Sequence, residues 1–124
     1  MAMWLGGIDT RIAATVSSGF LTRMDQMEQG HCMCWKFDGL RDLVDFTDIY
    51  ALHAPRPLQC QNGVKEPPSQ FPPAIAREVL PEIQRIYTDM GAPDNVVLDV
   101  HDGGHEIDLP KLLEFFEIHL RPGQ

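Results

Sequence analysis

The chain has 124 residues, 44% of them hydrophobic and 23% charged, which is the composition of one ordinary folded domain spanning residues 1–124. Its net charge of −8 opposes phosphate neutralisation, so we expect no nucleic acid and no membrane surface as a partner. The longest uncharged stretch, residues 12–22, is too short to span a bilayer. Three cysteines, Cys32, Cys34 and Cys60, are too few for a disulfide scaffold and favour a cytoplasmic protein.

The first third of the chain predicts a helix, a strand and a loop. Residues 1–9 are typical of the last turns of an apolar helix that Gly6 and Gly7 close. Residues 11–20 combine β-branched side chains with a final glycine and predict a short buried strand. Residues 21–39 have no sustained hydrophobic period and indicate a loop with one short helix.

The remainder alternates helices with strands. Strands are predicted over residues 56–63 and 95–100, and the proline-rich residues 65–73 predict a rigid loop. Helices are predicted over residues 40–52, 74–91 and 109–120, with Pro81 expected to kink or restart the second of these. The apolar faces of the three helices are Leu40, Leu43, Val44, Ile49 and Leu52; Ile75, Val79, Ile83, Ile86 and Met90; and Leu109, Leu112, Leu113, Phe116 and Leu120.

This order of elements predicts an α/β fold with parallel strands and helices on both faces, a three-layer sandwich. Ligands of such sheets bind beyond the carboxyl ends of the strands. Glu66 follows the second strand there, and His105 follows the third. A carboxylate that accepts a hydrogen bond from an imidazole orients the ring and stabilises the imidazolium, as a general base requires. We therefore expect Glu66 and His105 to act together.

Four segments carry a resemblance to a known family. They are "DTRIAATVSSGF", "HCMCWKFDGL", "HAPRPLQCQNGVKEPPSQFP" and "HDGGHEI". Together they closely resemble the acetylxylan esterase and dienelactone hydrolase-like branch of the α/β-hydrolases. The resemblance implies that His105 is the catalytic histidine, that Glu66 stands where the family usually has an aspartate as triad acid, and that no cofactor or metal is needed.

The serine of the triad has no counterpart in this sequence. No G-x-S-x-G motif occurs in the 124 residues, and in the family the nucleophile lies just before the helix that "MAMWLGGIDTRI" matches. The resemblance thus implies the C-terminal portion of a hydrolase domain that starts just after the nucleophile. Ser17 and Ser18 at the first strand end are alternative nucleophiles, but we expect them to bond to the backbone, because they lack the sharp strand-to-helix turn.

Other residues have plainer interpretations. His105 alone is also typical of a turn histidine, and Glu66 alone of a solvated loop carboxylate. A metal site at His105, Glu106 and Asp108 is disfavoured by the two preceding glycines, and Cys-x-Cys is too tight for the usual zinc spacing. We expect Cys32 and Cys34 to pack under a loop near the rim of the active site. His53 is expected to be a cation at a helix end with no further role.

The sequence is consistent with two functional hypotheses. The first is a serine hydrolase fragment that acts on a small carboxylic or acetyl ester in the full-length parent. The second is a non-catalytic hydrolase remnant that acts through oligomerisation or a binding partner. The edge of the first strand, residues 11–20, would be unpaired in both cases and favours a homo-oligomer.

Overall fold

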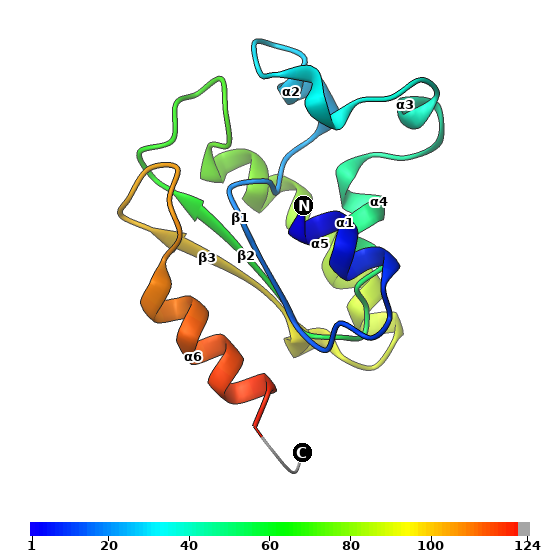
Figure 1. Ribbon diagram of the computed structural model, residues 1–124, viewed down its shortest axis with the longest axis vertical. Helices are drawn as coiled ribbons and strands as arrows, with labels where there is room; N and C mark the ends of the chain where they lie inside the picture. Colours follow the sequence, from blue (N-terminus) through cyan, green and yellow to red (C-terminus); the bar gives the residue numbers. More distant parts are fainter. Residues whose placement is uncertain (122–124) are drawn as a thin grey trace.

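Three parallel strands form the centre of the fold, and their order in the sheet follows their order in the chain (Figure 1). The computed structural model describes residues 1–121. The strands are β1 (Thr15–Ser18), β2 (Leu58–Gly63) and β3 (Val96–His101). Val16 pairs with Gln59, and Gln59 pairs with Val97, so the three carboxyl ends meet at one edge. The predicted parallel α/β architecture is confirmed.

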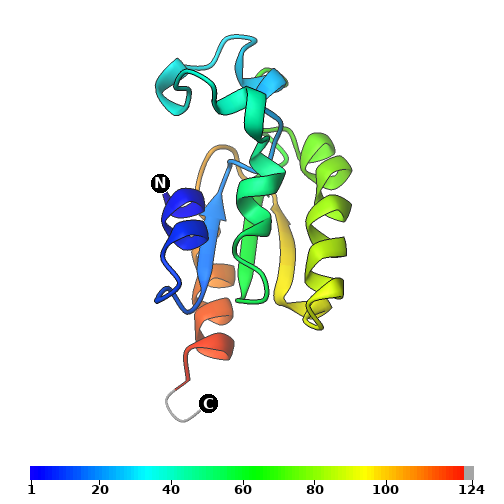
Figure 2. The same cartoon turned by 90° about the vertical axis from the view of Figure 1, so that its right-hand side faces the viewer.

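Helices cover both faces of this sheet. Figure 2 shows α1 (Ala2–Ile8), α4 (Phe46–Ala51) and α5 (Pro73–Asp89) side by side on one face. Figure 1 shows α6 (Leu109–His119) on the opposite face. A 3-10 turn, η2 (Pro93–Asn95), leads into β3. None of the described helices is long and apolar enough to cross a membrane.

The core lies between β2 and the three-helix layer. All six residues of β2 are buried, because helices cover both of its faces and strands flank both of its edges. Leu58 and Cys60 belong to the apolar core. The polar side chain of Gln61 is also fully buried, and its amide donates to the carbonyl of Asp108 at 3.0 Å, just before α6. This bond ties α6 to the central strand.

The glycines near the start of the chain serve packing and do not end the helix. Helix α1 continues through Gly6 and Gly7 to Ile8, so the predicted closure at these residues is wrong. A Cβ atom on Gly6 would lie 2.5 Å from Nε2 of His53 and would also clash with Thr15. The glycine pair thus lets α1 approach β1 and α4 closely.

His53 is correspondingly not the helix-end cation that we expected. It is 1% exposed, and its Nδ1 atom lies 3.0 Å from the carbonyl oxygen of Tyr50. Burial lowers the pKa of His53 below its ordinary value, with a smaller contribution from the positive charge of Arg56. His53 is therefore a core side chain that favours the neutral form.

The helix predicted over residues 40–52 is two helices. Helix α3 (Leu40–Leu43) ends where Val44 adopts an extended conformation, and α4 begins after Asp45. Asp45 and Asp48 form a reciprocal capping box at the start of α4. Because the chain turns at this point, Leu43 and Leu52 are exposed, contrary to the predicted apolar face.

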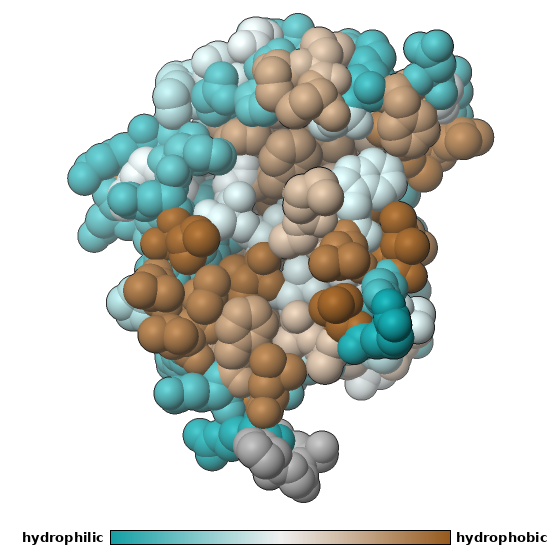
Figure 3. Space-filling view, in the orientation of Figure 1, coloured by the Kyte–Doolittle hydropathy of each residue, from teal (hydrophilic) through white to brown (hydrophobic). Residues whose placement is uncertain are grey.

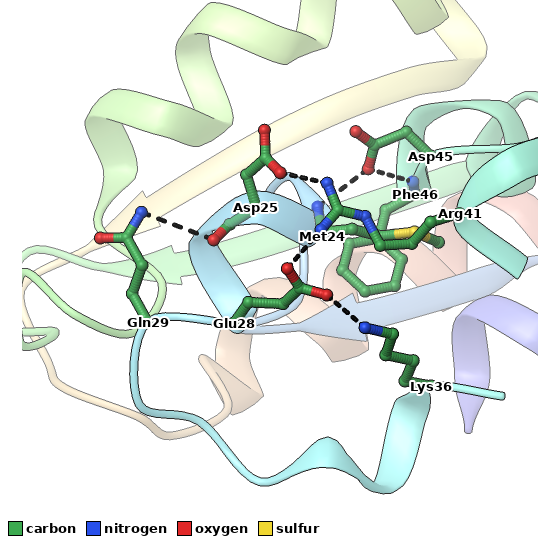
Figure 4. A network of polar contacts seen from close by, with 8 residues as sticks. All are labelled: Met24, Asp25, Glu28, Gln29, Lys36, Arg41, Asp45 and Phe46. Carbon is green, nitrogen blue, oxygen red and sulfur yellow. Dashed lines mark hydrogen bonds and ion pairs between the residues drawn. The ribbon is translucent and has the colours of Figure 1, made fainter. Parts of the chain in front are cut away.

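The loop predicted over residues 21–39 contains two short helices, α2 (Met24–Met27) and η1 (Met33–Trp35). A network of ion pairs holds it against α3 (Figure 4). Lys36 donates to Glu28 at 2.6 Å, and Arg41 pairs with both Glu28 and Asp25. The Glu28–Lys36 pair closes the segment between these two residues into a loop.

The last two long helices differ from expectation in their buried faces. Helix α5 runs through Pro81 without interruption. It buries Ala76 and Tyr87 along with the predicted Val79 and Ile83, while Met90 is exposed. Helix α6 buries only Phe115 fully, and three residues of its predicted face are about half exposed: Leu109, Leu113 and Leu120. Part of its apolar face is uncovered, because α1, α4 and α5 lie on the opposite face of the sheet (Figures 1 and 2).

Candidate active site

Glu66 lies in the loop that follows β2, at the carboxyl edge of the sheet. Backbone hydrogen bonds shape this loop: Val64 donates to the carbonyl of His101 at 2.9 Å, and Lys65 donates to that of Gly103 at 2.9 Å. A Cβ atom on Gly63 would clash with the carbonyl oxygens of Gly103 and Gly104. Gly63 therefore allows the loops after β2 and β3 to touch.

His105 lies in the neighbouring loop, between β3 and α6. The loop is closed by a bond from the Glu106 amide to the carbonyl of Gly104 at 3.0 Å, and the Glu106 carbonyl accepts from the Ser18 hydroxyl at 3.0 Å. Asp108 then caps α6 by accepting from the Lys111 amide. The imidazole of His105 is thereby placed over the carboxyl ends of the strands.

The two candidate residues meet directly. Nδ1 of His105 lies 2.7 Å from Oε1 of Glu66. The Glu66 side chain is 1% exposed, whereas that of His105 is 62% exposed. An ionised carboxylate only accepts hydrogen bonds, so it places the imidazole proton on Nδ1 and leaves Nε2 as the acceptor. The expectation that Glu66 is an ordinary solvated carboxylate does not fit this burial.

An aromatic cluster supports the imidazole from one side. Phe71 stacks on His105 with ring centroids 5.2 Å apart and an interplanar angle of 19°. Phe71 is itself packed against Phe20 and His31. Its backbone carbonyl accepts a hydrogen bond from the buried Asn62 side chain at 3.0 Å, which ties the Glu66 loop to the end of β2. This packing restricts how the His105 ring can turn.

Gly19 forms the other side of the pocket around the imidazole. A Cβ atom there would lie 2.7 Å from Cε1 and 2.9 Å from Nδ1 of His105, and 3.5 Å from Oε1 of Glu66. Gly19 also has a φ of +74°, which side chains other than glycine disfavour. Both the close approach and the backbone conformation therefore require glycine directly after β1.

The two serines at the end of β1 have other partners. The Ser18 hydroxyl bonds to a backbone carbonyl, as predicted. The Ser17 hydroxyl is buried and lies 2.7 Å from the Tyr50 hydroxyl, so its expected backbone partner is wrong. Both serines border a cavity of about 400 Å³ between α1 and the 21–39 segment, whose other lining residues include Trp4, Phe20, Cys34 and Trp35.

The site thus offers one oriented imidazole and no metal ligand set. Within residues 1–121 no three His, Cys, Asp or Glu side chains come together as a metal site requires. An imidazole whose Nδ1–H is held by a buried carboxylate can take a proton at Nε2. The arrangement is suited to activating a hydroxyl group presented beside His105.

Comparison with solved structures places this geometry in a known fold. The chain matches a carbohydrate esterase family 15 glucuronoyl esterase from Caldicellulosiruptor kristjansonii with a TM-score of 0.73 over 99% of its length, at 21% identity. Its three parallel strands and interleaved helices superpose on part of that domain. The fold is a partial α/β-hydrolase fold.

Two further esterases share the α/β-hydrolase match. One is described as a promiscuous family 15 esterase from a marine bacterial metagenome, with a TM-score of 0.69, 18% identity and 95% of this chain covered. The other is the glucuronoyl esterase catalytic domain from Hypocrea jecorina, with a TM-score of 0.66, 15% identity and 96% covered. The chain spans 41%, 38% and 41% of the lengths of the three matched chains. No family model and no curated protein matches the sequence.

Several residues at the candidate site have no role that the sequence predicts. The sequence predicts that Gly19 and Asn62 lie at the carboxyl edge of the sheet and that Phe71 lies in a loop, but it assigns none of them a contact with His105 or Glu66. The signal for Gly19 is its position at the end of a predicted strand, at the edge where ligands bind. Phe71 and Asn62 act through packing and one side chain to backbone bond, for which the sequence has no distinctive spacing.

Proposed function

We propose that this chain is the acid- and histidine-bearing part of a serine ester hydrolase. The observation that supports the proposal most directly is the 2.7 Å contact between Nδ1 of His105 and the buried carboxylate of Glu66. It lies at the carboxyl edge of a parallel sheet, where α/β folds bind their ligands. The structural likeness to esterases supports the same class of reaction.

In this proposal His105 transfers protons, and Glu66 orients and stabilises the His105 ring. Nε2 of His105 takes the proton of a serine hydroxyl as that oxygen attacks the ester carbonyl, and then returns the proton to the leaving alcohol. Glu66 keeps the proton on Nδ1 and stabilises the imidazolium that forms. A water activated by the same imidazole then releases the acid from the acyl-serine.

The serine and the oxyanion-binding amides are assigned to polypeptide outside this sequence. The 124 residues contain no G-x-S-x-G, and the Ser17 and Ser18 hydroxyls are engaged by Tyr50 and Glu106.

The preferred substrate is a carboxylic ester. The sequence resemblance favours an acetyl ester, and the matched solved structures favour a glucuronoyl ester.

The first test is genetic. The DNA upstream of the Met1 codon is read for an in-frame G-x-S-x-G, which the proposal expects. The protein that contains both parts is then assayed on p-nitrophenyl acetate and on a methyl ester of glucuronic acid, with a fluorophosphonate probe to label the serine. Hydrolysis that survives a His105→Ala substitution would contradict the proposal.

The isolated 124-residue chain supplies a second test. We expect no fluorophosphonate labelling of this chain. Labelling that disappears in Ser17→Ala or Ser18→Ala would show that the nucleophile lies within it, and would overturn the assignment of the serine to another segment.

A non-catalytic role through self-association is the alternative, and the surface gives a specific reason for it. The unpaired edge of β1 lies between α1 and α6, where apolar side chains gather on one face (Figure 3). The exposed ones in these two helices are Leu5, Ile8, Leu109, Leu113 and Ile118, and Leu120 directly follows α6. Exposed strand edges and apolar patches favour association.

Light scattering after gel filtration distinguishes this alternative. A dimer or larger assembly that Leu113→Lys dissociates would favour self-association through α6. Glu114→Gln, which also raises the net charge by one and lies next to Leu113 in the same helix, is the matched control for the added charge. A chain that is monomeric at all accessible concentrations would eliminate the homo-oligomer.

A further inference from the structure

The two exposed cysteines of the chain face each other. Cys32 and Cys34 flank one residue at the start of η1, and their Sγ atoms are 2.8 Å apart, although both are free thiols. Both are exposed, so the expected packing under a loop is wrong. The third cysteine, Cys60, is fully buried at the centre of β2. Only the Cys32–Cys34 pair is therefore open to reagents in solution.

We propose that Cys32 and Cys34 form a reversible dithiol–disulfide site that reacts with small-molecule disulfides. A covalent S–S bond is about 2.04 Å long, so closing it requires the two sulfur atoms to approach by somewhat less than about 1 Å. The two groups are already oriented toward each other. Since the resulting bond would be exposed, it would remain accessible to thiol reductants.

The surrounding loop is anchored on both sides of the pair. Before it, the His31 amide donates to the Met27 carbonyl at 3.3 Å. After it, the Lys36 amide donates to the Met33 carbonyl at 3.1 Å, and the Lys36 ammonium pairs with Glu28 (Figure 4). These contacts limit the conformations of the loop and hold the thiols near each other. Ring closure therefore costs less conformational entropy than in a free peptide.

The two thiols are not equivalent. Hydrogen bonding from Cys34 lowers the pKa of Cys32 below the ordinary value for a thiol, whereas the same contact raises the pKa of Cys34. Burial raises the pKa of Cys60 to about 12. Because the thiolate is the attacking species, Cys32 is the nucleophile, Cys34 resolves the intermediate, and Cys60 is inert.

The reaction balances in two steps. The Cys32 thiolate attacks one sulfur of the small-molecule disulfide, forming a mixed disulfide and releasing one thiolate. Cys34 then loses its proton and attacks the Cys32 sulfur, releasing the second thiolate. The protein is oxidised by two electrons, the small disulfide is reduced to two thiols, and the two cysteine protons end on those thiols.

A soft metal ion is a weaker explanation for the pair. A tight site needs further ligands, and no group of three His, Cys, Asp or Glu side chains suited to a metal occurs in the part of the chain that the structure describes. Nδ1 of His31 is directed to the Cys32 carbonyl, not to the sulfur atoms. Two thiols alone are sufficient for disulfide exchange.

The Cys32–Cys34 pair lies close to the candidate active site. Cys34 lines the cavity that Ser17 and Ser18 border. His31, adjacent to Cys32, packs edge-on against Phe71, and Phe71 stacks on His105. The dithiol thus lies on the segment that forms the rim of the candidate active site. It does not depend on whether that site hydrolyses esters.

The experiment treats the 124-residue chain with oxidised glutathione, blocks the remaining thiols and measures intact mass. The wild type should lose two hydrogen atoms, carry no glutathione and retain one thiol, Cys60, that is blocked only in urea; dithiothreitol should then restore the Cys32 and Cys34 thiols. Cys34→Ser should accumulate a stable glutathione adduct. Cys32→Ser should likewise accumulate a stable adduct, because the remaining exposed thiol has no second thiol beside it to displace the glutathione.

Two controls make the result decisive. Cys60→Ser should behave as the wild type except that no thiol remains after oxidation. Reaction of Cys60 in the wild type only after urea is added shows that the chain was folded during the assay. A wild type that keeps three free thiols, a wild type that retains glutathione, or a Cys34→Ser variant that forms no adduct would each overturn the proposal.

Discussion

Nδ1 of His105 and Oε1 of Glu66 lie 2.7 Å apart, although 39 positions separate the two residues in the chain. The contact joins two loops that follow neighbouring parallel strands, β2 and β3. The glutamate oxygen Oε2 is buried and has no hydrogen-bond partner among the described residues. The carboxylate therefore directs its one polar contact at the imidazole.

Glu66→Gln should lower kcat of the nucleophile-bearing enzyme by roughly 10³–10⁴-fold, as loss of the acid does in other triads. The amide has nearly the same shape but no charge, so it no longer stabilises the imidazolium. Glu66→Asp, which keeps the charge on a shorter side chain, should retain more activity than Glu66→Gln. Glu114→Gln on the exposed side of α6 should leave kcat unchanged. Equal activity of Glu66→Gln and wild type would remove Glu66 from the mechanism.

Gly19→Ala should displace His105 and also destabilise the chain. The added Cβ would meet the imidazole at 2.7 Å, and a φ of +74° costs about 1–3 kcal/mol for a residue other than glycine. Gly91→Ala is a matched control, because Gly91 has a φ of +73° and no atoms within 4 Å of its Cβ position. Thermal unfolding should show a loss in both variants. Only Gly19→Ala should move the NMR signals of the His105 ring, and identical spectra would contradict the close approach.

The free energy of unfolding should fall as the pH falls below about 6.5, the ordinary pKa of histidine. Burial lowers the pKa of His53 in the folded chain, so the unfolded chain takes up this proton at a higher pH than the folded chain does. The loss continues down to the folded pKa, at no more than about 1.4 kcal/mol per pH unit.

Urea unfolding at a series of pH values measures this effect. His53→Gln should reduce the loss of unfolding free energy between about pH 6.5 and the lower pKa that His53 has in the folded chain. An unchanged slope in His53→Gln would show that another group is responsible.

Asp45→Ala should lower the free energy of unfolding by about 1–2 kcal/mol, the usual cost of a lost helix cap. Oδ1 of Asp45 accepts from the backbone amides of Phe46 at 2.7 Å and Met24 at 2.9 Å, so it joins α4 to α2. Asp42→Ala, in α3, removes an exposed carboxylate and should cost less than about 0.5 kcal/mol. Denaturant titration of both variants compares them, and equal losses would argue against the cap.

The residue pattern predicted the three strands and the helix over residues 109–120, although β1 (Thr15–Ser18) is shorter than the strand predicted over residues 11–20. It failed over residues 40–52, because a capping box within the apolar pattern ends one helix and starts another. It also misjudged Leu109 and Leu113 in α6, since a pattern identifies an apolar face but not whether another layer covers it. The exposure of Cys32 and the burial of His53 likewise depend on contacts with distant segments.

The sequence by itself determined the alternation of strands and helices and the residue types available at the carboxyl edge. Parallel pairing follows from that alternation, and it brings the Glu66 and His105 loops to the same edge. Only the tertiary structure decided that the two side chains meet, that Gly19 and Phe71 enclose the imidazole, and that Cys32 faces Cys34. These relationships require positions accurate to a fraction of an ångström, which come from the packing of segments far apart in the chain.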